Sequence, residues 1–431
     1  MSKDKQKIYF QKSLLFRKEH FGILALLCDG RRYQLDNNYF ESLKFLFKKH
    51  TINNCPGLSG ETGKAFLDYL INKKIVGFED KKAKPRFIEN NYISKDCITF
   101  PRTVYWECSR KCNFNCIHCY SSSENILFDG ELSLVQVKKM IRELSLRGTE
   151  FLSIGGGEPL MYSHIIEVIK YATKYSVSIE ISTNASLVTD DYILQLKKAG
   201  LIFVQVSLDG ASEEIYSKIR RGGKLSLVVE NIKKLSKHFV VSTCMVVNKI
   251  NYGEVEAVID LSVSCGATYF RLIPFMEVGR ASTMQKLQLE KSEFQKIYQM
   301  ILYKRKEIGT KIYIQLNENL VIPNKKNISW MPENHYGCSA GRTTCGIDPY
   351  GNVYPCSFMI FDKLICGNIK DTTLLEIWKE SPVLKMLRSI SKLKGKCAKC
   401  QHLDLCRGGC RAAAYLKKCD IRDADYMCSI K

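Results

Sequence analysis

The stretch TVYWECSRKCNFNCIHCY, residues 103–120, is the most informative part of this sequence. It begins with an apolar strand pattern and continues with Cys112, Cys116 and Cys119, which stand at a C-x3-C-x2-C spacing. Three thiolates this close together can bind three irons of a [4Fe–4S] cube and leave the fourth iron without a protein ligand. A structural zinc ion usually takes four protein ligands, and the nearby Cys108 belongs to the strand. The spacing therefore predicts an iron–sulfur cluster with one open iron.

Strand and helix patterns alternate through the middle of the chain. Ser133 and Gln136 have the pattern of a capping box before a helix that Gly148 closes, and Thr189 precedes a helix that stops at Gly200. Six consecutive βα units predict a parallel sheet that curls into a barrel or part of one. Ligands of such folds lie at the carboxyl ends of the strands. The predicted strands are 103–108, 151–155, 177–182, 202–208, 239–247 and 268–274.

The composition is that of an ordinary globular protein, with 45% apolar and 25% charged residues among 431. No apolar run reaches the roughly 20 residues that cross a bilayer, and the opening MSKDKQKIYFQK lacks the apolar stretch of a secretory signal. We therefore expect a cytoplasmic protein without a membrane partner, in which many of the 19 cysteines bind metal. The net charge of +21 fits either an acidic partner or a lysine-rich surface.

The first 97 residues have a different pattern, that of a small mixed domain. Two β-rich segments, 21–28 and 31–36, flank an Asp-Gly turn and predict a hairpin. Helical patterns follow at 37–49 and 60–73, and the polar stretch 81–91 is interpreted as a linker. A small hairpin with helices is the arrangement of a winged helix-turn-helix.

The chain beyond about residue 326 is loop-rich and short of apolar periodicity. A hydrophobic core alone would not stabilise such a segment, so metal ligation would have to contribute. Its cysteines include the run Cys397-x2-Cys400-x5-Cys406-x3-Cys410. The sequence thus predicts three domains, at residues 1–97, 98–325 and 326–431.

The barrel motifs together resemble the radical S-adenosylmethionine (SAM) superfamily. CNFNCIHC (112–119) matches its cluster signature, GGGEP (155–159) its GGEP motif, STNAS (182–186) its T-N-G turn, and SLDG (207–210) the segment that contacts the SAM ribose. This resemblance implies an α/β fold with a partial (β/α)6 TIM-like barrel whose open iron chelates SAM. It also implies the reaction, in which the reduced cluster cleaves SAM to methionine and a 5′-deoxyadenosyl radical that abstracts a substrate hydrogen.

The same resemblance implies the SAM contacts. The glycine run is expected at the SAM amino group and Arg220 at the carboxylate, although the usual R-G pair is Arg220-Arg221 here. His118 and Tyr120, on either side of Cys119, are candidates to pack on adenine. The expected SAM-binding residues are Gly155, Gly156, Gly157, Glu158, Ser182, Asn184, Ser207, Asp209, Arg220, His118 and Tyr120.

The C-terminal cysteines resemble the SPASM domain, which binds two auxiliary [4Fe–4S] clusters. CSAGRTTCGIDPYGNVYPC (338–356) matches its first segment and RGGCRAAA (407–414) its second, whereas two zinc knuckles would leave the first segment unexplained. Cys419 competes with Cys428 for the last position, and we prefer Cys428 because DADYMC (423–428) resembles the D-P-x-C ending, although it lacks the proline. The implied ligands are Cys338, Cys345, Cys356 and Cys410 for auxiliary cluster I, and Cys397, Cys400, Cys406 and Cys428 for auxiliary cluster II. The cysteines that match no ligand position, and are expected to be small apolar residues, are Cys28, Cys55, Cys97, Cys108, Cys244, Cys265 and Cys366.

The first 97 residues resemble the peptide-recognition element of peptide maturases. That element is similar to the small chaperone of pyrroloquinoline quinone biosynthesis and binds a leader peptide as an added strand. The region has 19 Lys and Arg against 11 Asp and Glu, which suits an acidic leader. A DNA-binding winged helix is the alternative, but no base-reading arginine cluster stands out.

These resemblances imply a maturase that forms a thioether or carbon–carbon cross-link in a ribosomally made precursor peptide, with an electron donor such as a flavodoxin or a ferredoxin. Cross-linking removes two electrons, which suits auxiliary clusters as acceptors. An anaerobic sulfatase-maturating enzyme is an alternative, but those relatives carry an aspartate where this chain has Ser357. A peptide epimerase and an iron–sulfur regulator that binds nucleic acid are further alternatives. Spacing singles out no general base.

Overall fold

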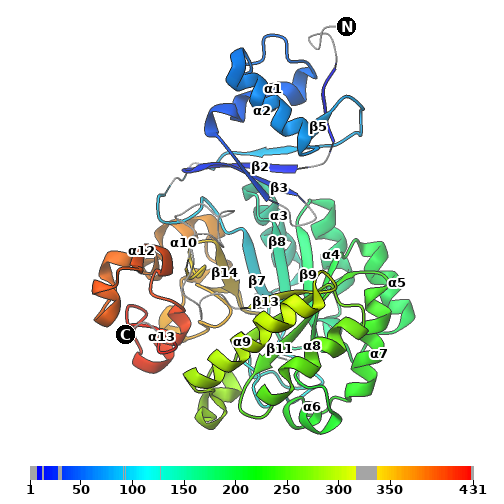
Figure 1. Ribbon diagram of the computed structural model, residues 1–431, viewed down its shortest axis with the longest axis vertical. Helices are drawn as coiled ribbons and strands as arrows, with labels where there is room; N and C mark the ends of the chain where they lie inside the picture. Colours follow the sequence, from blue (N-terminus) through cyan, green and yellow to red (C-terminus); the bar gives the residue numbers. More distant parts are fainter. Residues whose placement is uncertain are drawn as a thin grey trace. The chain divides into compact units, whose positions relative to one another are not determined.

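The computed structural model describes residues 7–11, 14–27, 32–90, 92, 94–126, 128–316 and 337–428. The chain forms two compact units, one of residues 1–102 with 146–150, the other of residues 103–145 with 151–431 (Figure 1). The second unit includes both the predicted barrel and the predicted cysteine-rich segment. The division of the chain into three domains therefore stays a prediction.

The first unit contains a four-stranded sheet in the order β4-β3-β2-β6. β2 (Leu14–Glu19) and β3 (Gly22–Leu27) form an antiparallel hairpin, β4 (Arg32–Leu35) pairs antiparallel with β3, and β6 (Arg86–Ile88) pairs parallel with β2. The two strands of the predicted hairpin are therefore present as β3 and β4, while the turn between them lies outside the described residues. β2 was not predicted, and β6 lies inside the stretch interpreted as a linker, where the polar composition hides three strand residues.

Two helices follow the sheet of the first unit, α1 (Phe40–Lys49) and α2 (Gly60–Asn72), close to the predicted ranges. The short strands β1 (Tyr9–Phe10) and β5 (Val76–Gly77) pair antiparallel beside them. Apolar side chains from the sheet and both helices form one buried core. Burial of this apolar surface stabilises the unit.

The second unit is built on a ten-stranded sheet in the order β13-β12-β11-β10-β9-β8-β7-β14-β15-β16. All neighbouring strands from β13 to β14 in that order are parallel, and β15 and β16 then follow antiparallel. The predicted parallel sheet is therefore confirmed. The strands are β7 (Thr103–Glu107), β8 (Phe151–Gly155), β9 (Ser178–Thr183), β10 (Phe203–Ser207), β11 (Val240–Val247), β12 (Tyr269–Pro274), β13 (Tyr313–Leu316), β14 (Thr344–Ile347), β15 (Asn352–Tyr354) and β16 (Gly367–Asn368).

Two features of this sheet go beyond the six predicted strands. β13 adds a seventh parallel strand to the barrel, but its four residues are too few to give a clear pattern. β7 pairs with β8 and with β14 rather than with β13. Within the described residues the sheet therefore stays open, as a partial barrel does, and β14 joins the cysteine-rich segment to it.

Helices connect the parallel strands and lie on the outside of the curved sheet (Figure 1). The predicted capping box is confirmed, because Ser133 N donates to Gln136 Oε1 at 2.9 Å and Gln136 N donates to Ser133 Oγ at 3.4 Å. Thr189 Oγ1 likewise accepts from Tyr192 N at 3.2 Å. The helices of this unit are α3 (Leu134–Arg147), α4 (Ile165–Lys174), α5 (Asp190–Ala199), α6 (Glu213–Ile219), α7 (Leu225–Ser236), α8 (Val255–Ser264), α9 (Lys291–Ile308), α10 (Leu374–Glu380), α11 (Pro382–Arg388), α12 (Leu403–Cys406) and α13 (Arg411–Lys418).

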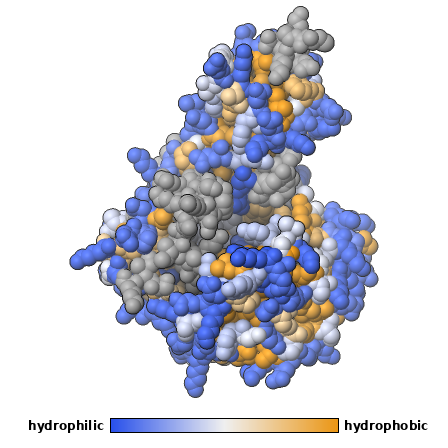
Figure 2. Space-filling view, viewed as in Figure 1, coloured by the Kyte–Doolittle hydropathy of each residue, from blue (hydrophilic) through white to orange (hydrophobic). Residues whose placement is uncertain are grey.

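Hydrophilic side chains cover much of the face shown in Figure 2, with smaller apolar areas between them. Exposed apolar residues on the barrel helices include Leu194 and Leu227. Scattered apolar residues of this kind are normal on a protein surface. No helix in the described part of the chain combines the length and the apolar character needed to cross a membrane.

Candidate active site

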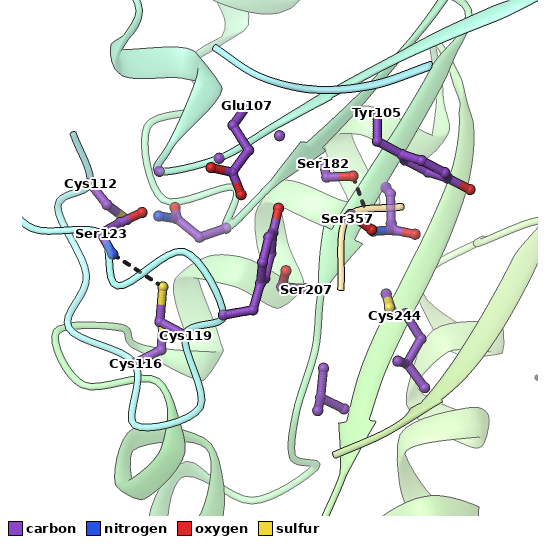
Figure 3. Close-up of a pocket in the computed structure, with 18 of the residues that line it drawn as sticks. Tyr105, Glu107, Cys112, Cys116, Cys119, Ser123, Ser182, Ser207, Cys244 and Ser357 are labelled. Atoms are coloured by element: carbon purple, nitrogen blue, oxygen red, sulfur yellow. Dashed lines mark hydrogen bonds between the residues drawn. The ribbon is translucent and has the colours of Figure 1, made fainter. Parts of the chain in front are cut away.

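The three cysteines of the C-x3-C-x2-C motif lie in the loop between β7 and α3, where the parallel strands end (Figure 3). Arg280, which follows β12, donates from its backbone to Cys119 O at 2.9 Å and from Nη1 to Cys116 O at 2.7 Å. At the other end of the loop, Cys112 N donates to Glu124 O at 2.9 Å. Protein hydrogen bonds therefore fix the course of this loop.

All three thiols of the motif line one cavity. Burial raises the pKa of Cys112 to about 11 and also raises the pKa of Cys116, so metal ligation must displace protons from both thiols. Arg220 favours the Cys116 thiolate, because Nη1 lies 3.6 Å from Sγ. Nowhere in the described ranges do three His, Cys, Asp or Glu side chains gather closely enough for one metal ion.

The glycine run after β8 passes very close to the cysteine loop. Gly157 N donates to Ser109 O at 2.7 Å. Gly156 has a φ of +111°, and a Cβ there would lie 2.5 Å from Ser109 O. A Cβ at Gly157 would overlap the carbonyl of Lys111. Only glycine fits at both positions, and the exposed backbone lines the cavity that a cofactor would fill.

Glu158 connects the glycine run to the end of β9. Its carboxylate accepts from Thr183 Oγ1 at 2.6 Å, from Asn184 N at 2.8 Å and from Leu160 N at 3.0 Å. Burial raises the pKa of Glu158, and these three donors act against that rise. The residue thus has partners within the protein and positions neighbouring backbone.

The turn that follows β9 is hydrogen-bonded to the cysteine loop. Asn184 Nδ2 donates to Asn113 Oδ1 at 2.9 Å, and Asn113 Nδ2 donates to Ser186 Oγ at 2.8 Å. Ala185 stands where the T-N-G turn has glycine, and its φ is +59°. Asn231 Nδ2 supports this turn by donating to Ala185 O at 2.8 Å.

Asp209 lies behind the cavity wall. Its carboxylate accepts from Arg220 Nε at 2.5 Å and from Val246 N at 2.6 Å, and it lies 3.0 Å from His118 Nε2. Burial alone would raise the pKa of Asp209, but Arg220 and His118 outweigh it and keep that pKa well below the usual range. Asp209 therefore positions Arg220 and His118. The other expected SAM-binding residues all line the cavity, and Asp209 is not among its lining residues.

Polar side chains that were not predicted complete the cavity wall. Arg271 Nη1 donates to Gln205 Oε1 at 2.6 Å, and Gln205 Nε2 donates to Ser182 Oγ at 3.1 Å. Glu107, the last residue of β7, also lines the cavity (Figure 3). Side chains alternate between the two faces of a strand, so Tyr105 and Glu107 lie on the same face of β7. This alternation is the sequence signal from which Glu107 could have been predicted as a lining residue. Other unpredicted lining residues include Trp106, Ser153, Cys244 and Ser357.

The structure groups three of the four cysteines predicted for auxiliary cluster I. Cys338, Cys356 and Cys410 pack against one apolar cluster. Burial raises the pKa of Cys356, and the nearby thiols of Cys338 and Cys410 raise it further. Cys345 lies fully buried on β14, where Cys366 is the neighbouring thiol. Ligation by Cys345 therefore stays a prediction.

The four cysteines predicted for auxiliary cluster II line a single hollow in the C-terminal segment. Asp425 ties this segment together, since it accepts from Cys410 N at 2.8 Å and from Met427 N at 2.9 Å. Cys419 is exposed at the end of α13 and does not line the hollow. This placement supports Cys428 over Cys419. The lining cysteines are Cys397, Cys400, Cys406 and Cys428.

The cysteines without a predicted ligand position are mostly buried, as expected of small apolar residues. Cys366 is half-buried, and Cys28 lies outside the described residues. The buried ones are Cys55, Cys97, Cys108, Cys244 and Cys265.

Comparison with known proteins agrees with this geometry. Residues 106–262 match the Radical SAM superfamily and residues 338–401 the SPASM iron–sulfur cluster-binding domain. Mycofactocin maturase MftC of Mycolicibacterium smegmatis is 31% identical, over 80% of this chain and 86% of its own length. An AdoMet-dependent heme synthase of Methanosarcina barkeri is 27% identical, over 76% of this chain and 96% of its own length.

Two solved structures share the fold. Streptococcus suis SuiB bound to its precursor peptide SuiA has a TM-score of 0.74 and 18% identity, covering 98% of this chain and 100% of SuiB. The anSMEcpe protein with bound AdoMet has a TM-score of 0.62 and 20% identity, covering 76% of this chain and 94% of that one.

A three-cysteine loop and a glycine-lined cavity at the ends of parallel strands define an iron–sulfur enzyme of the barrel type. This chain belongs to the radical SAM superfamily and carries a SPASM domain.

Proposed function

We propose that this radical SAM enzyme modifies a ribosomally made precursor peptide, and that the modification is a thioether or carbon–carbon cross-link. The observation that carries the proposal is its 31% identity to a mycofactocin maturase over 80% of the chain. The fold shared with SuiB over 98% of the chain adds support, because SuiB is solved with a precursor peptide bound.

When bound and reduced through its cluster, SAM supplies the radical that removes a hydrogen atom from the substrate. The chain positions this chemistry. Cys112, Cys116 and Cys119 would ligate the cluster, and the glycine run lets backbone groups approach SAM closely. Buried apolar wall residues such as Trp106 and Ile347 exclude water from the cavity.

The first unit is proposed to bind the leader of the peptide. β4 and β6 stand at the two ends of its sheet order, and an extended peptide can add to such an edge by main-chain hydrogen bonds. The surplus of 19 basic over 11 acidic residues in the first 97 favours an acidic leader.

Two auxiliary [4Fe–4S] clusters are proposed in the C-terminal segment, giving three clusters in all. Their role is to accept the second electron of a two-electron oxidation and to pass electrons to and from a flavodoxin or ferredoxin. Lys396 and Lys399 line the hollow of the second cysteine set. Cationic side chains at that site suit an acidic electron carrier.

The test of this function is an anaerobic reaction of the reconstituted protein with SAM, a strong reductant and peptides encoded by short reading frames beside its gene. Mass spectrometry of the peptide should show the loss of two hydrogens per event. An unchanged elemental composition with deuterium uptake from solvent would instead identify an epimerase. Formation of 5′-deoxyadenosine without any peptide product would contradict peptide modification.

The sulfatase-maturating alternative has less support from the site. Ser357 lines the cavity at the position where those relatives carry an aspartate. A serine hydroxyl does not ionise in the range where a carboxylate acts as a base. The fold shared with anSMEcpe covers 76% of this chain.

A further inference from the structure

Glu107 is an anomaly in the cavity wall. The residue is only 4% exposed, and neither carboxyl oxygen has a hydrogen-bond partner at ordinary distance and angle among the described residues. Within that part of the chain, the Tyr120 hydroxyl is the one donor near its carboxylate. A buried carboxylate without partners is costly, and polar groups buried in proteins are nearly always bonded. Glu107 faces the cavity (Figure 3), so a ligand in that cavity is the available source of donors.

The other carboxylate that lines the cavity differs in this respect. Glu158 accepts three hydrogen bonds from Thr183, Asn184 and Leu160. Among the described lining residues, Glu107 and Glu158 are the only carboxylates. Glu107 is therefore the one anionic group in this wall that a ligand would have to satisfy.

The position of Glu107 indicates which part of SAM lies beside it. A Cβ on Gly156 would lie 3.1 Å from both Cα and Cβ of Glu107, so this residue packs against the glycine run. The run itself is hydrogen-bonded to the loop that carries Cys112. An α-amino acid can chelate a metal through its amino and carboxylate groups. Such binding would bring the amino-acid end of SAM to the cysteine loop and near Glu107.

We propose that the Glu107 carboxylate accepts a hydrogen bond from the α-amino group of SAM. Within the amino-acid end of SAM the amino group is the donor, because the sulfonium and the carboxylate have no hydrogen to donate. A donor bonded to a carboxylate forms a charge-assisted bond. Glu107 would thus fix the amino-acid end of SAM and gain a charge-assisted donor that no described residue supplies. The proposal rests on membership of the superfamily and needs no peptide substrate.

Neighbouring groups shift the pKa of the Glu107 carboxyl group in both directions. Burial raises the pKa of Glu107 to about 7, Arg110 lowers it, Asp348 raises it and the Tyr120 hydroxyl lowers it again. The buried Cys108 thiol is a further titratable neighbour. An amino-group donor stabilises the ionised form, so SAM binding should lower this pKa.

The test compares two ligands on two variants of the full chain, reconstituted anaerobically with its clusters. S-adenosylhomocysteine has the amino-acid end, and 5′-methylthioadenosine lacks it. Glu107→Gln should weaken S-adenosylhomocysteine about tenfold in calorimetry, the loss expected for one bond to a charged group. The affinity for methylthioadenosine should stay within about twofold. Glu180→Gln is the matched control, since Glu180 lies on β9 and is bonded by Ser153 Oγ at 3.0 Å.

Each outcome decides the proposal. Unchanged binding of S-adenosylhomocysteine to Glu107→Gln would overturn it, as would an equal loss for both ligands. An equal loss caused by Glu180→Gln would also count against it. Iron content and the visible spectrum of the cluster verify that each variant is loaded.

A second measurement uses the unaltered protein, in case Glu107→Gln does not assemble. The ratio of the affinity for S-adenosylhomocysteine to that for methylthioadenosine should rise several-fold between about pH 6 and pH 8, because Glu107 ionises as the pH passes its pKa. A ratio that stays constant over this range would contradict the proposal.

Discussion

The cysteine loop of the barrel and the cysteines of the C-terminal segment differ in how much of their arrangement the protein provides. Hydrogen bonds from Arg280 and to Glu124 fix the loop on a rigid parallel sheet. The second auxiliary set lies instead among short pieces, such as the four-residue α12, around a hollow. The comparison teaches that protein hydrogen bonds fix the course of the loop, whereas we expect the second auxiliary set to depend on its metal for part of its structure.

The largest expected effect concerns the loop. Cys112→Ala should reduce 5′-deoxyadenosine formation to background, because a cube with two protein ligands does not present a stable open iron. The measurement is chromatography of an anaerobic reaction with SAM and dithionite. Cys108→Ala is the control, and it should retain most of the activity, since Cys108 is buried on the strand side of the loop. Full activity of Cys112→Ala would refute the assignment of the loop.

The second prediction concerns how far the C-terminal segment and the barrel each depend on iron for their structure. Removal of iron by a chelator under reducing conditions should abolish hydrogen-exchange protection across residues 395–428, since structural metal sites contribute several kcal/mol to folding. The strands β8 to β11 should retain their protection, because their backbone bonds do not involve the cysteines. Equal loss of protection in both regions would remove the proposed difference.

A smaller effect separates two candidate ligands of the second auxiliary cluster. Cys428→Ser should lose about four irons per chain, the content of one cube, and Cys419→Ser should lose none. The reason is that Cys428 lines the hollow and Cys419 is exposed outside it. Iron analysis with visible absorbance gives the answer, and loss of iron from Cys419→Ser alone would reverse the assignment.

The smallest effect concerns Cys345. Cys356→Ala should lose the iron of auxiliary cluster I, whereas Cys345→Ala should lose much less, because the Cys345 thiol lies beside Cys366 on β14. Thermal unfolding accompanies the iron analysis, since removing a buried thiol costs stability by itself. Equal iron loss in the two variants would show that Cys345 moves to the cluster as it assembles.

Much of the fold was predictable because its signals are local. Strand and helix periods and the caps at Ser133 and Thr189 gave the βα order, and the spacing of Cys112, Cys116 and Cys119 gave the cluster loop. β13 and β6 were missed, since three or four residues carry too little pattern. The pairing of β14 with β7 depends on contacts between segments more than 200 residues apart in the sequence and has no local signal.

The sequence by itself determined the class of enzyme, because the cysteine spacing and the glycine run are patterns within short segments. The tertiary structure alone decided which polar groups share the cavity. Glu107 looks like any strand-end carboxylate in the sequence, and its shortage of hydrogen-bond donors follows from its burial beside the glycine run. Whether a buried polar group has hydrogen-bond partners depends on which residues surround it in space. The spacing of residues along the sequence does not contain that information.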